Sequence, residues 1–298
     1  MQHTDLPLIP SENAGTCLHC RSAGAGAWQA RRAFLRLGTA AVLATGGASA
    51  LAQVNVGGGS RLRQLVPAQT LEEAAAEQYQ QLLAKAKAQG ALAQPGNPQL
   101  RRLHAIAQRL IPHAAQWNER ARSWRWEVNL IGSKEINAFC MPGGKIAFYT
   151  GILDQLQLTD DEAAMIMGHE MAHALREHSR EQLAKSQATN LGLSLGAQLL
   201  GLGDLGNMAV KMGAQLLTLQ FSRSDESDAD LVGLELAARA GYNPQAAVSL
   251  WQKMGRATGG GGQGLAFLST HPSGPERIRE LERNVPKVEG LYRQAGGR

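Results

Sequence analysis

The sequence predicts an α+β fold that is predominantly helical and contains one small β-sheet. Apolar residues recur at helical spacing in two segments, 71–91 and 100–111. Residues 124–131 alternate large apolar with polar side chains, as a strand does, and a Gly-Gly pair at 143–144 joins two further extended segments as a hairpin. With 298 residues, 44% of them hydrophobic, the chain is long enough to build a substantial core.

A helix is expected to follow Thr159, which can cap an acidic first turn and an apolar body. Residues four apart on a helix lie about 400° apart around its axis, so His169 and His173 project from the same side. Two imidazoles at this spacing can bind one Zn²⁺, and Glu170 can reach water at the open side of the metal. His-Glu-Met-Ala-His at 169–173 therefore predicts one zinc ion per chain. The alternative is an accidental match on an ordinary surface helix.

A second polar cluster, at residues 221–230, runs into another helical pattern. Glu226 and Asp230 are also four apart, so a helix places both carboxylates on one face. Glu226 can then complete a site of two histidines and one glutamate, and Asp230 can accept a hydrogen bond from a ligand histidine. Acidic residues also gather at helix starts because of the helix dipole, so this interpretation depends on the upstream histidine motif.

Four motifs together resemble those of the CAAX-prenyl-protease and HtpX-like family of zinc metalloendopeptidases. They occur in the family's order: residues 137–153, HEMAH at 169–173, FSRSDESDAD at 221–230, and STHP at 269–272 with Arg277-Ile278. The resemblance implies a zincin-like metalloprotease domain of the gluzincin type (HExxH…ExxxD), here as a periplasmic bacterial member.

The resemblance also implies roles for individual residues. Zn²⁺ would be held by His169, His173 and Glu226, with Glu170 as the general base that activates a zinc-bound water and Asp230 supporting a ligand histidine. His271 falls in the family's His-Pro motif, whose histidine lies close to the metal and either stabilises the oxyanion or caps the open position.

The expected function is zinc-dependent hydrolysis of peptide bonds in envelope proteins that are misfolded or belong to the outer membrane. Two alternatives stay open: a zinc-bearing, autoinhibited chaperone or binding module with little turnover, and another metallohydrolase such as an amidase. An edge strand beside the metal can pair with an extended substrate, which favours polypeptide substrates. Asn137, Ala138 and Phe139 are the candidate substrate-binding residues, with strand 145–148 as an alternative and an ordinary packed hairpin as the plain interpretation.

The first 52 residues are expected to be an export signal. Arg31-Arg32 precede a mildly apolar, small-residue stretch that ends in Ala50-Leu51-Ala52, which is typical of a twin-arginine signal with a signal-peptidase site. Cleavage and release into the periplasm is the first interpretation, and an uncleaved anchor the second. The expected organisation is then a flexible segment (53–70) and one metalloprotease domain (71–298), divided into a helical cover (71–123), a catalytic core (124–283) and a tail (284–298).

The remaining features of the sequence carry weaker expectations. The net charge of +5 is spread thinly, so no nucleic-acid partner is predicted. The apolar stretch 191–219 predicts two buried helices, with contact with a membrane or an outer-membrane assembly as the minority interpretation. The Gly-rich segment 259–264 is expected to be a mobile loop that delivers His271 to the site. The helix of residues 169–173 is expected to continue through His178, leaving this histidine exposed, and Cys140 is expected to be a packed thiol.

Overall fold

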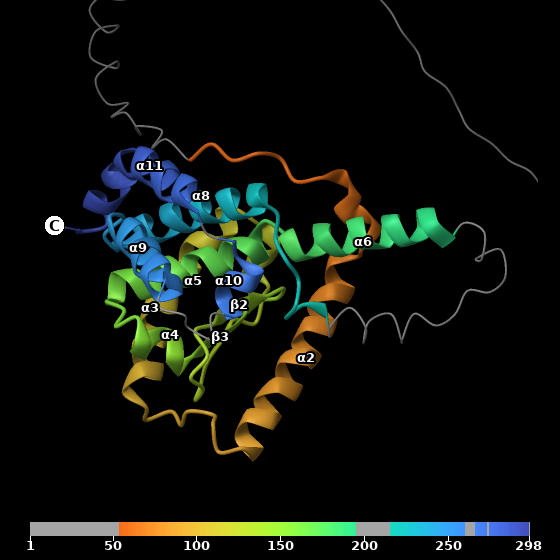
Figure 1. The fold of residues 1–298 in the computed structure, drawn as a ribbon, viewed down its shortest axis with the longest axis horizontal. Helices are drawn as coiled ribbons and strands as arrows, with labels where there is room; N and C mark the ends of the chain where they lie inside the picture. Colours follow the sequence, from red (N-terminus) through yellow and green to blue (C-terminus); the bar gives the residue numbers. More distant parts are fainter. Residues whose placement is uncertain (1–53, 195–214, 260–265, 273, 298) are drawn as a thin grey trace, which may run out of the picture. The chain divides into compact units, whose positions relative to one another are not determined.

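The computed structural model describes residues 54–194, 215–259, 266–272 and 274–297 (Figure 1). All of the predicted export signal, most of the apolar stretch 191–219 and the greater part of the Gly-rich segment lie outside these residues. The helices are η1 (Arg61–Leu65), α2 (Ala68–Ala88), α3 (Pro98–Leu110), η2 (Ile111–Gln116), η3 (Glu119–Arg122), α4 (Thr150–Gln155), α5 (Asp160–Leu175), α6 (His178–Ser194), α8 (Arg223–Arg239), α9 (Ala246–Gly259), α10 (Ala266–Thr270) and α11 (Pro275–Gln294). The strands are β1 (Glu127–Ile131), β2 (Ala138–Met141) and β3 (Lys145–Tyr149). A predominantly helical fold with one small sheet is confirmed.

The three strands form a mixed sheet in the order β1-β3-β2, in which β3 pairs parallel with β1 and antiparallel with β2. β2 and β3 are the predicted hairpin. Its turn needs glycine: Gly143 and Gly144 have φ angles of 82° and 76°, and a Cβ on Gly144 would lie 2.7 Å from the Trp126 ring. Because β3 is paired on both sides, the alternative that strand 145–148 binds substrate at an edge is wrong. Among the described residues, β1 and β2 are the edge strands of this sheet, and β2 is the one that contains Ala138 and Phe139.

The sheet separates two hydrophobic clusters because successive side chains of a strand point to opposite faces. Ile146 and Phe148 are fully buried on the face that belongs to the main core with α3 and α5, whereas Ala147 points to the other face, against α2. On the main-core side α5 packs between β2 and α8, and α11 covers α8 beyond it (Figure 1). The helix with the histidine motif is therefore the buried centre of this part of the chain.

The backbones of α5 and α8 touch at a pair of glycines. A Cβ on Gly168 would lie 2.8 Å from the carbonyl oxygen of Gly233, and a Cβ on Gly233 would lie 2.6 Å from the amide nitrogen of His169. Real Cβ atoms essentially never approach so closely. Two glycines thus allow these helices to cross at main-chain contact, immediately beside His169.

The predicted continuation of this helix through His178 is wrong. α5 ends at Leu175, and the amide of Arg176 closes the last turn on the carbonyl of Ala172 at 2.8 Å. Glu177 then adopts a left-handed conformation, with a φ of 60°, and α6 starts in a new direction at His178. A left-handed residue breaks the helical register, so the angular position expected for His178 no longer applies.

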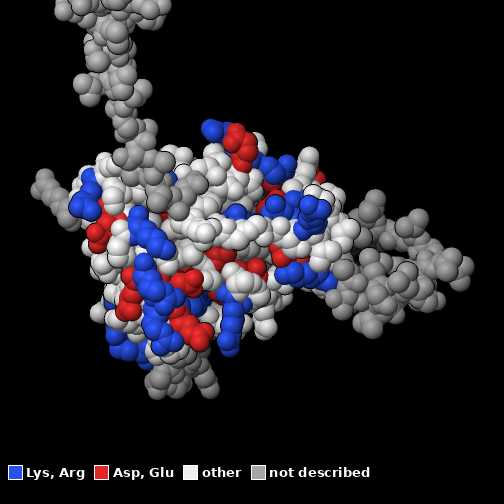
Figure 2. Space-filling model, turned by 90° about the horizontal axis from the view of Figure 1, so that it is seen from above, with Lys and Arg blue, Asp and Glu red and all other residues white. Residues whose placement is uncertain are grey.

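The surface of the described residues carries charges of both signs. On the face drawn in Figure 2, basic and acidic side chains lie intermixed. Within the described parts of the chain, no helix combines the length and the apolar character needed to cross a bilayer.

Candidate metal centre and active site

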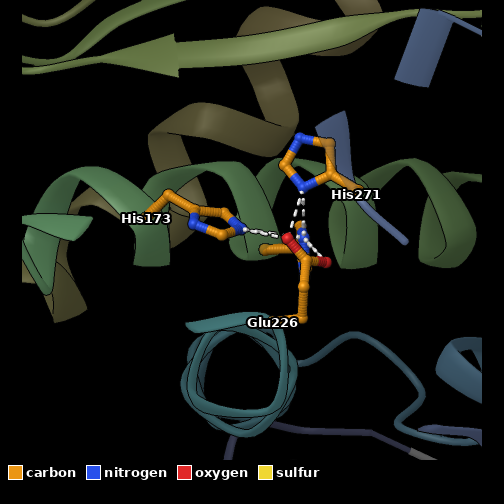
Figure 3. A group of neighbouring side chains, drawn as sticks. His173, Glu226 and His271 are labelled. Atoms are coloured by element: carbon orange, nitrogen blue, oxygen red, sulfur yellow. Dashed lines mark hydrogen bonds and ion pairs between the residues drawn. The ribbon is translucent and has the colours of Figure 1, made fainter. Parts of the chain in front are cut away.

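Four buried side chains from three segments converge at one point. His169 and His173 come from α5, Glu226 from α8, and His271 from the residues just after α10. One ligand atom from each lies within 4.8 Å of the others. The two Nε2 atoms of His169 and His173 are 3.2 Å apart, and Oε1 of Glu226 lies 3.5 Å from Nε2 of His173. Figure 3 shows the rings of His173 and His271 directed at the Glu226 carboxylate.

Capping residues determine where α5 and α8, the helices that carry His169, His173 and Glu226, begin. The Thr159 hydroxyl accepts the amide of Glu162 at 3.2 Å, and the Glu162 carboxylate accepts the amide of Thr159 at 2.9 Å. Ser222 and Asp225 form the same reciprocal capping box at the start of α8. These boxes satisfy amide groups that a helix terminus otherwise leaves unpaired. Together with the glycine contact, they set the positions of the ligand residues along and between the helices.

Asp230 and His169 lie within hydrogen-bond distance of each other. Nδ1 of His169 lies 3.0 Å from Oδ1 of Asp230, and because a carboxylate only accepts, the ring proton belongs on Nδ1. Nε2 is then left with its lone pair directed at the other ligands. Arg277 donates to both oxygens of Asp230 at 2.7 Å. Burial alone would raise the pKa of Asp230, but the charge of Arg277 and the hydrogen bond from His169 outweigh it and lower the pKa to about 2.

Glu170 lies beside this cluster and is almost completely buried, with 2% of its surface exposed. Its Oε1 has no hydrogen-bond partner among the described residues, and the nearest charged group, Nε2 of His271, is 3.6 Å away. Burial raises the pKa of Glu170, although the neighbouring imidazoles of His271 and His169 oppose this shift. A buried carboxylate oxygen without a partner requires a proton, water or cation nearby.

The donor set fits zinc. Two imidazole nitrogens and one carboxylate oxygen are the ligands of many catalytic zinc sites, which keep a fourth position open. The facing lone pairs of His169 and His173 are mutually repulsive without a cation or a proton between them. Burial and the neighbouring imidazole of His169 hold the pKa of His173 well below its usual range, which keeps this ring neutral, as metal binding requires.

His271 supplies the fourth potential ligand atom of this cluster. Its Nδ1 is 2.9 Å from Oε1 of Glu226 and 3.4 Å from Nε2 of His169. Phe267 stacks on its ring at a centroid distance of 4.4 Å. Burial alone would lower the pKa of His271, but the carboxylates of Glu170 and Glu226 outweigh burial and raise it.

A cavity of about 250 Å³ opens beside the cluster. Asn137, Ala138 and Phe139, at the start of the edge strand β2, line it together with Glu170, His173 and His271. Apolar side chains, among them Phe221 and Leu217, line it as well. Cys140 also borders this cavity, but burial raises its thiol pKa well above the usual range, so it is a packed thiol rather than a thiolate nucleophile.

Comparison with known proteins places this site in a family. A family model described as peptidase family M48 matches residues 97–285. The chain belongs to this family. Mitochondrial metalloendopeptidase OMA1 of Schizosaccharomyces pombe is 39% identical to it over 166 residues, which cover 55% of this chain and 48% of that protein. Metalloprotease LoiP of Escherichia coli is 28% identical to it over 151 residues, which cover 50% of this chain and 58% of that protein.

A third relative, the putative beta-barrel assembly-enhancing protease of Vibrio cholerae, is 28% identical over 170 residues, covering 53% of this chain and 35% of that protein. In each of these three relatives the match spans less than two thirds of the relative's own length. The prediction of a metallopeptidase is confirmed at the level of family M48. The narrower assignment to the CAAX-prenyl-protease and HtpX-like group stays a prediction.

Several side chains of this site were not predicted from the sequence. His178 is buried, with 3% of its surface exposed, so the expectation of an exposed side chain is wrong. The guanidinium of Arg277 bridges Asp230 and Glu226, with Nη1 2.6 Å from Oε2 of Glu226, and lies 3.7 Å from the Trp251 ring. Phe221 stacks on His173 at 3.9 Å. Arg277 and Phe221 belong to motifs described above, but a sequence motif does not predict which side chains are in contact.

Proposed function

We propose that the chain is a zinc-dependent metalloendopeptidase with a gluzincin-type site of the HtpX-like kind. The observation that carries this proposal is the convergence of His169, His173 and Glu226 beside the unpartnered carboxylate oxygen of Glu170. A structural zinc site has no use for a buried general base next to its ligands. Membership of peptidase family M48 and relatives named as metalloendopeptidases support the same class of enzyme.

In this proposal His169, His173 and Glu226 hold one zinc ion, and Asp230 and Arg277 keep His169 and Glu226 in place. When bound, zinc lowers the pKa of water towards neutrality and polarises a peptide carbonyl. Glu170 accepts the proton of the attacking water and passes it to the leaving nitrogen of the peptide. Its raised pKa makes the carboxylate a stronger base for the first transfer, and a pKa nearer the working pH keeps both the protonated and the ionised form accessible during turnover.

The substrate would bind as an extended chain along the free edge of β2, beside Asn137, Ala138 and Phe139. Main-chain hydrogen bonds to a strand edge orient a peptide independently of its sequence, and side-chain pockets then select residues. The apolar lining around Phe221 and Leu217 favours substrates with apolar side chains near the scissile bond.

We further propose that the substrates are misfolded or outer-membrane proteins of the envelope, and that residues 1–52 direct the protein to the periplasm by the twin-arginine route. The name of the Vibrio cholerae relative, a putative beta-barrel assembly-enhancing protease, supports an envelope role. Peripheral contact with the membrane or with an outer-membrane assembly belongs to the same proposal.

The test is zinc content and casein cleavage by metal-replete, full-length protein, with wild type beside Glu170→Gln. Glutamine keeps the shape of the side chain but cannot take a proton, so we expect one zinc per chain in both proteins and cleavage lost in the variant. Glu119→Gln is the matched control, because Glu119 is exposed, pairs with Arg122 and is not among the residues that line the cavity. Full activity of zinc-loaded Glu170→Gln would refute the assigned role.

The contacts of His271 keep a second candidate function open. Nδ1 of its ring lies 3.4 Å from Nε2 of His169 and 2.9 Å from Oε1 of Glu226, so His271 could itself occupy a ligand position and exclude water or substrate from zinc. The alternative is therefore a zinc-bearing, autoinhibited chaperone or binding module. One zinc per chain with no cleavage by wild-type protein would favour it over the peptidase.

A further inference from the structure

We propose that His178 and Asp228 are positioning residues of the metal centre, which hold the proton of His173 on Nδ1 and so leave its Nε2 free to bind zinc. The proposal rests on the zinc site described above. It extends that site to residues that belong to neither the histidine motif nor the ligand set.

His173, His178 and Asp228 form a chain of hydrogen bonds that leads away from the metal cluster. Nδ1 of His173 lies 3.0 Å from Nδ1 of His178, and Nε2 of His178 lies 3.1 Å from Oδ2 of Asp228. Both rings are buried, with 2% and 3% of their surface exposed, and they meet edge to face at a centroid distance of 5.0 Å. Water therefore does not compete effectively for these hydrogen bonds.

The carboxylate of Asp228, at the end of this chain, determines which atom donates in each hydrogen bond. Asp228 only accepts, so a neutral His178 carries its proton on Nε2. Nδ1 of His178 then has only a lone pair, and it must accept from Nδ1 of His173. His173 is left with a lone pair on Nε2, the atom that faces Glu226 and His169.

Each ligand histidine thus has its own acceptor. Ligand histidines generally donate their second ring N–H to a carboxylate, a carbonyl or water, which fixes the tautomer and the orientation of the ring. His169 does so directly, through Asp230. For His173 the carboxylate of Asp228 is one imidazole farther away, and His178 fills the gap.

The backbone at Glu177 is what aims His178 into this chain of hydrogen bonds. On an uninterrupted helix, residues five apart point about 140° away from each other, which would turn His178 from the site. The left-handed φ of 60° at Glu177 restarts the helix and returns the ring to His173. A non-glycine residue in this conformation costs of order 1 kcal/mol or more, and such residues cluster at functional sites.

Asp228 is itself held in place. Nε of Arg176 donates to the same Oδ2 at 2.8 Å, and Arg176 also donates to the carbonyl of Gly57 in the N-terminal segment. The other oxygen, Oδ1, is buried without a hydrogen-bond partner among the described residues. All of the hydrogen bonding of Asp228 therefore passes through the oxygen that faces His178.

The test compares three full-length variants by their zinc dissociation constants, measured in competition with a chromogenic chelator. His178→Phe keeps an aromatic ring but removes the acceptor, and we expect about a 10- to 100-fold loss of zinc affinity. His178→Asn restores an acceptor near the position of Nδ1 and should recover most of this loss. His104→Phe is the control, because His104 is exposed and bonds only the carbonyl of Val128 among the described contacts, so its zinc affinity should equal that of wild type.

A packing role would give a different pattern. Asparagine is much smaller than histidine, so His178→Asn would then be the more damaged variant, in zinc affinity and in the Tm of the metal-free protein alike. That pattern, or wild-type affinity in His178→Phe, would overturn the proposal. If His178→Phe does not fold, Asp228→Leu tests the same chain of hydrogen bonds from its other end, and unchanged zinc affinity there would also overturn it. Failure of wild-type protein to bind zinc would instead refute the site itself.

Discussion

Replacing Gly233 by alanine tests whether the distance between α5 and α8 controls the metal centre. The added Cβ would lie 2.6 Å from the amide nitrogen of His169 and 2.8 Å from the carbonyl carbon of Gly168. Both atoms belong to backbone, so no side chain can rotate out of the way. To reach ordinary contact at 3.4 Å, the helices must separate by about 0.8 Å at this point.

That separation is large for a metal site. Zinc–ligand distances are kept within about 0.2 Å, and the variant moves Glu226 and Asp230 on α8 relative to His169 and His173 on α5. A misplacement of about 1 Å costs roughly 100-fold in rate, so we expect kcat/KM to fall by about 100-fold and zinc affinity to fall with it. The free energy of unfolding should fall by no more than about 2 kcal/mol. Overpacking costs about 1–3 kcal/mol, but alanine has a better helix propensity than glycine, which offsets about 1 kcal/mol of this loss.

The assay is zinc affinity by chelator competition together with kcat/KM on a peptide substrate, after a thermal melt has established that the variant folds. Gly255→Ala in α9 is the matched control, because a Cβ there meets nothing within 4 Å. It should raise the free energy of unfolding by up to about 1 kcal/mol and leave zinc affinity unchanged. Wild-type zinc affinity and kcat/KM in folded Gly233→Ala would refute the argument.

Two further predictions concern the start of α5 and the export signal. Glu162 is buried and its Oε2 lies 2.6 Å from Nζ of Lys253. Burial alone would raise the pKa of Glu162, but the hydrogen bonds from Lys253, Thr159 and Ser249 outweigh it and lower the pKa below its usual value. The ionised carboxylate therefore stabilises the fold above about pH 4.5, and this contribution is lost as the pH falls through the lowered pKa. Glu162→Gln should cost about 2 kcal/mol at pH 7 in the free energy of unfolding, with the difference from wild type closing in acid; an equal difference at pH 7 and pH 3 would contradict this. Changing Arg31 and Arg32 to lysine should retain the precursor in the cytoplasm, as measured by cell fractionation, and normal export of that variant would remove the case for the twin-arginine route.

The helical fold and the pairing of the candidate ligands on helix faces could be predicted from local patterns, because both depend on short-range periodicity. The spacing of four between His169 and His173, and again between Glu226 and Asp230, needs only a helix to place each pair on one face. The hairpin followed from the glycine pair at 143–144, whose positive φ angles no other residue adopts as easily. The roles of the site residues remain predictions that the experiments above address.

What could not be predicted depends on long-range contacts or on a single backbone angle. His178 was expected to be exposed because nothing in the sequence marks Glu177 as left-handed; glycine and asparagine are the usual residues there. Arg277 meets Asp230 across 47 residues of sequence, and no periodicity connects them. Phe221 reaches His173 only because α8 crosses α5. Each of these contacts follows from how elements pack, which a one-dimensional pattern does not contain.

The bridge made by Arg277 also bears on the order in which the site is completed during synthesis. Glu226 and Asp230 are buried carboxylates, and both contact one guanidinium, which the ribosome adds 47 residues after Asp230. Until α11 docks, the two acids repel each other and favour an open, hydrated arrangement of α8. The proposed catalytic centre is therefore incomplete until the segment that carries Arg277 has been synthesised and has packed against α8.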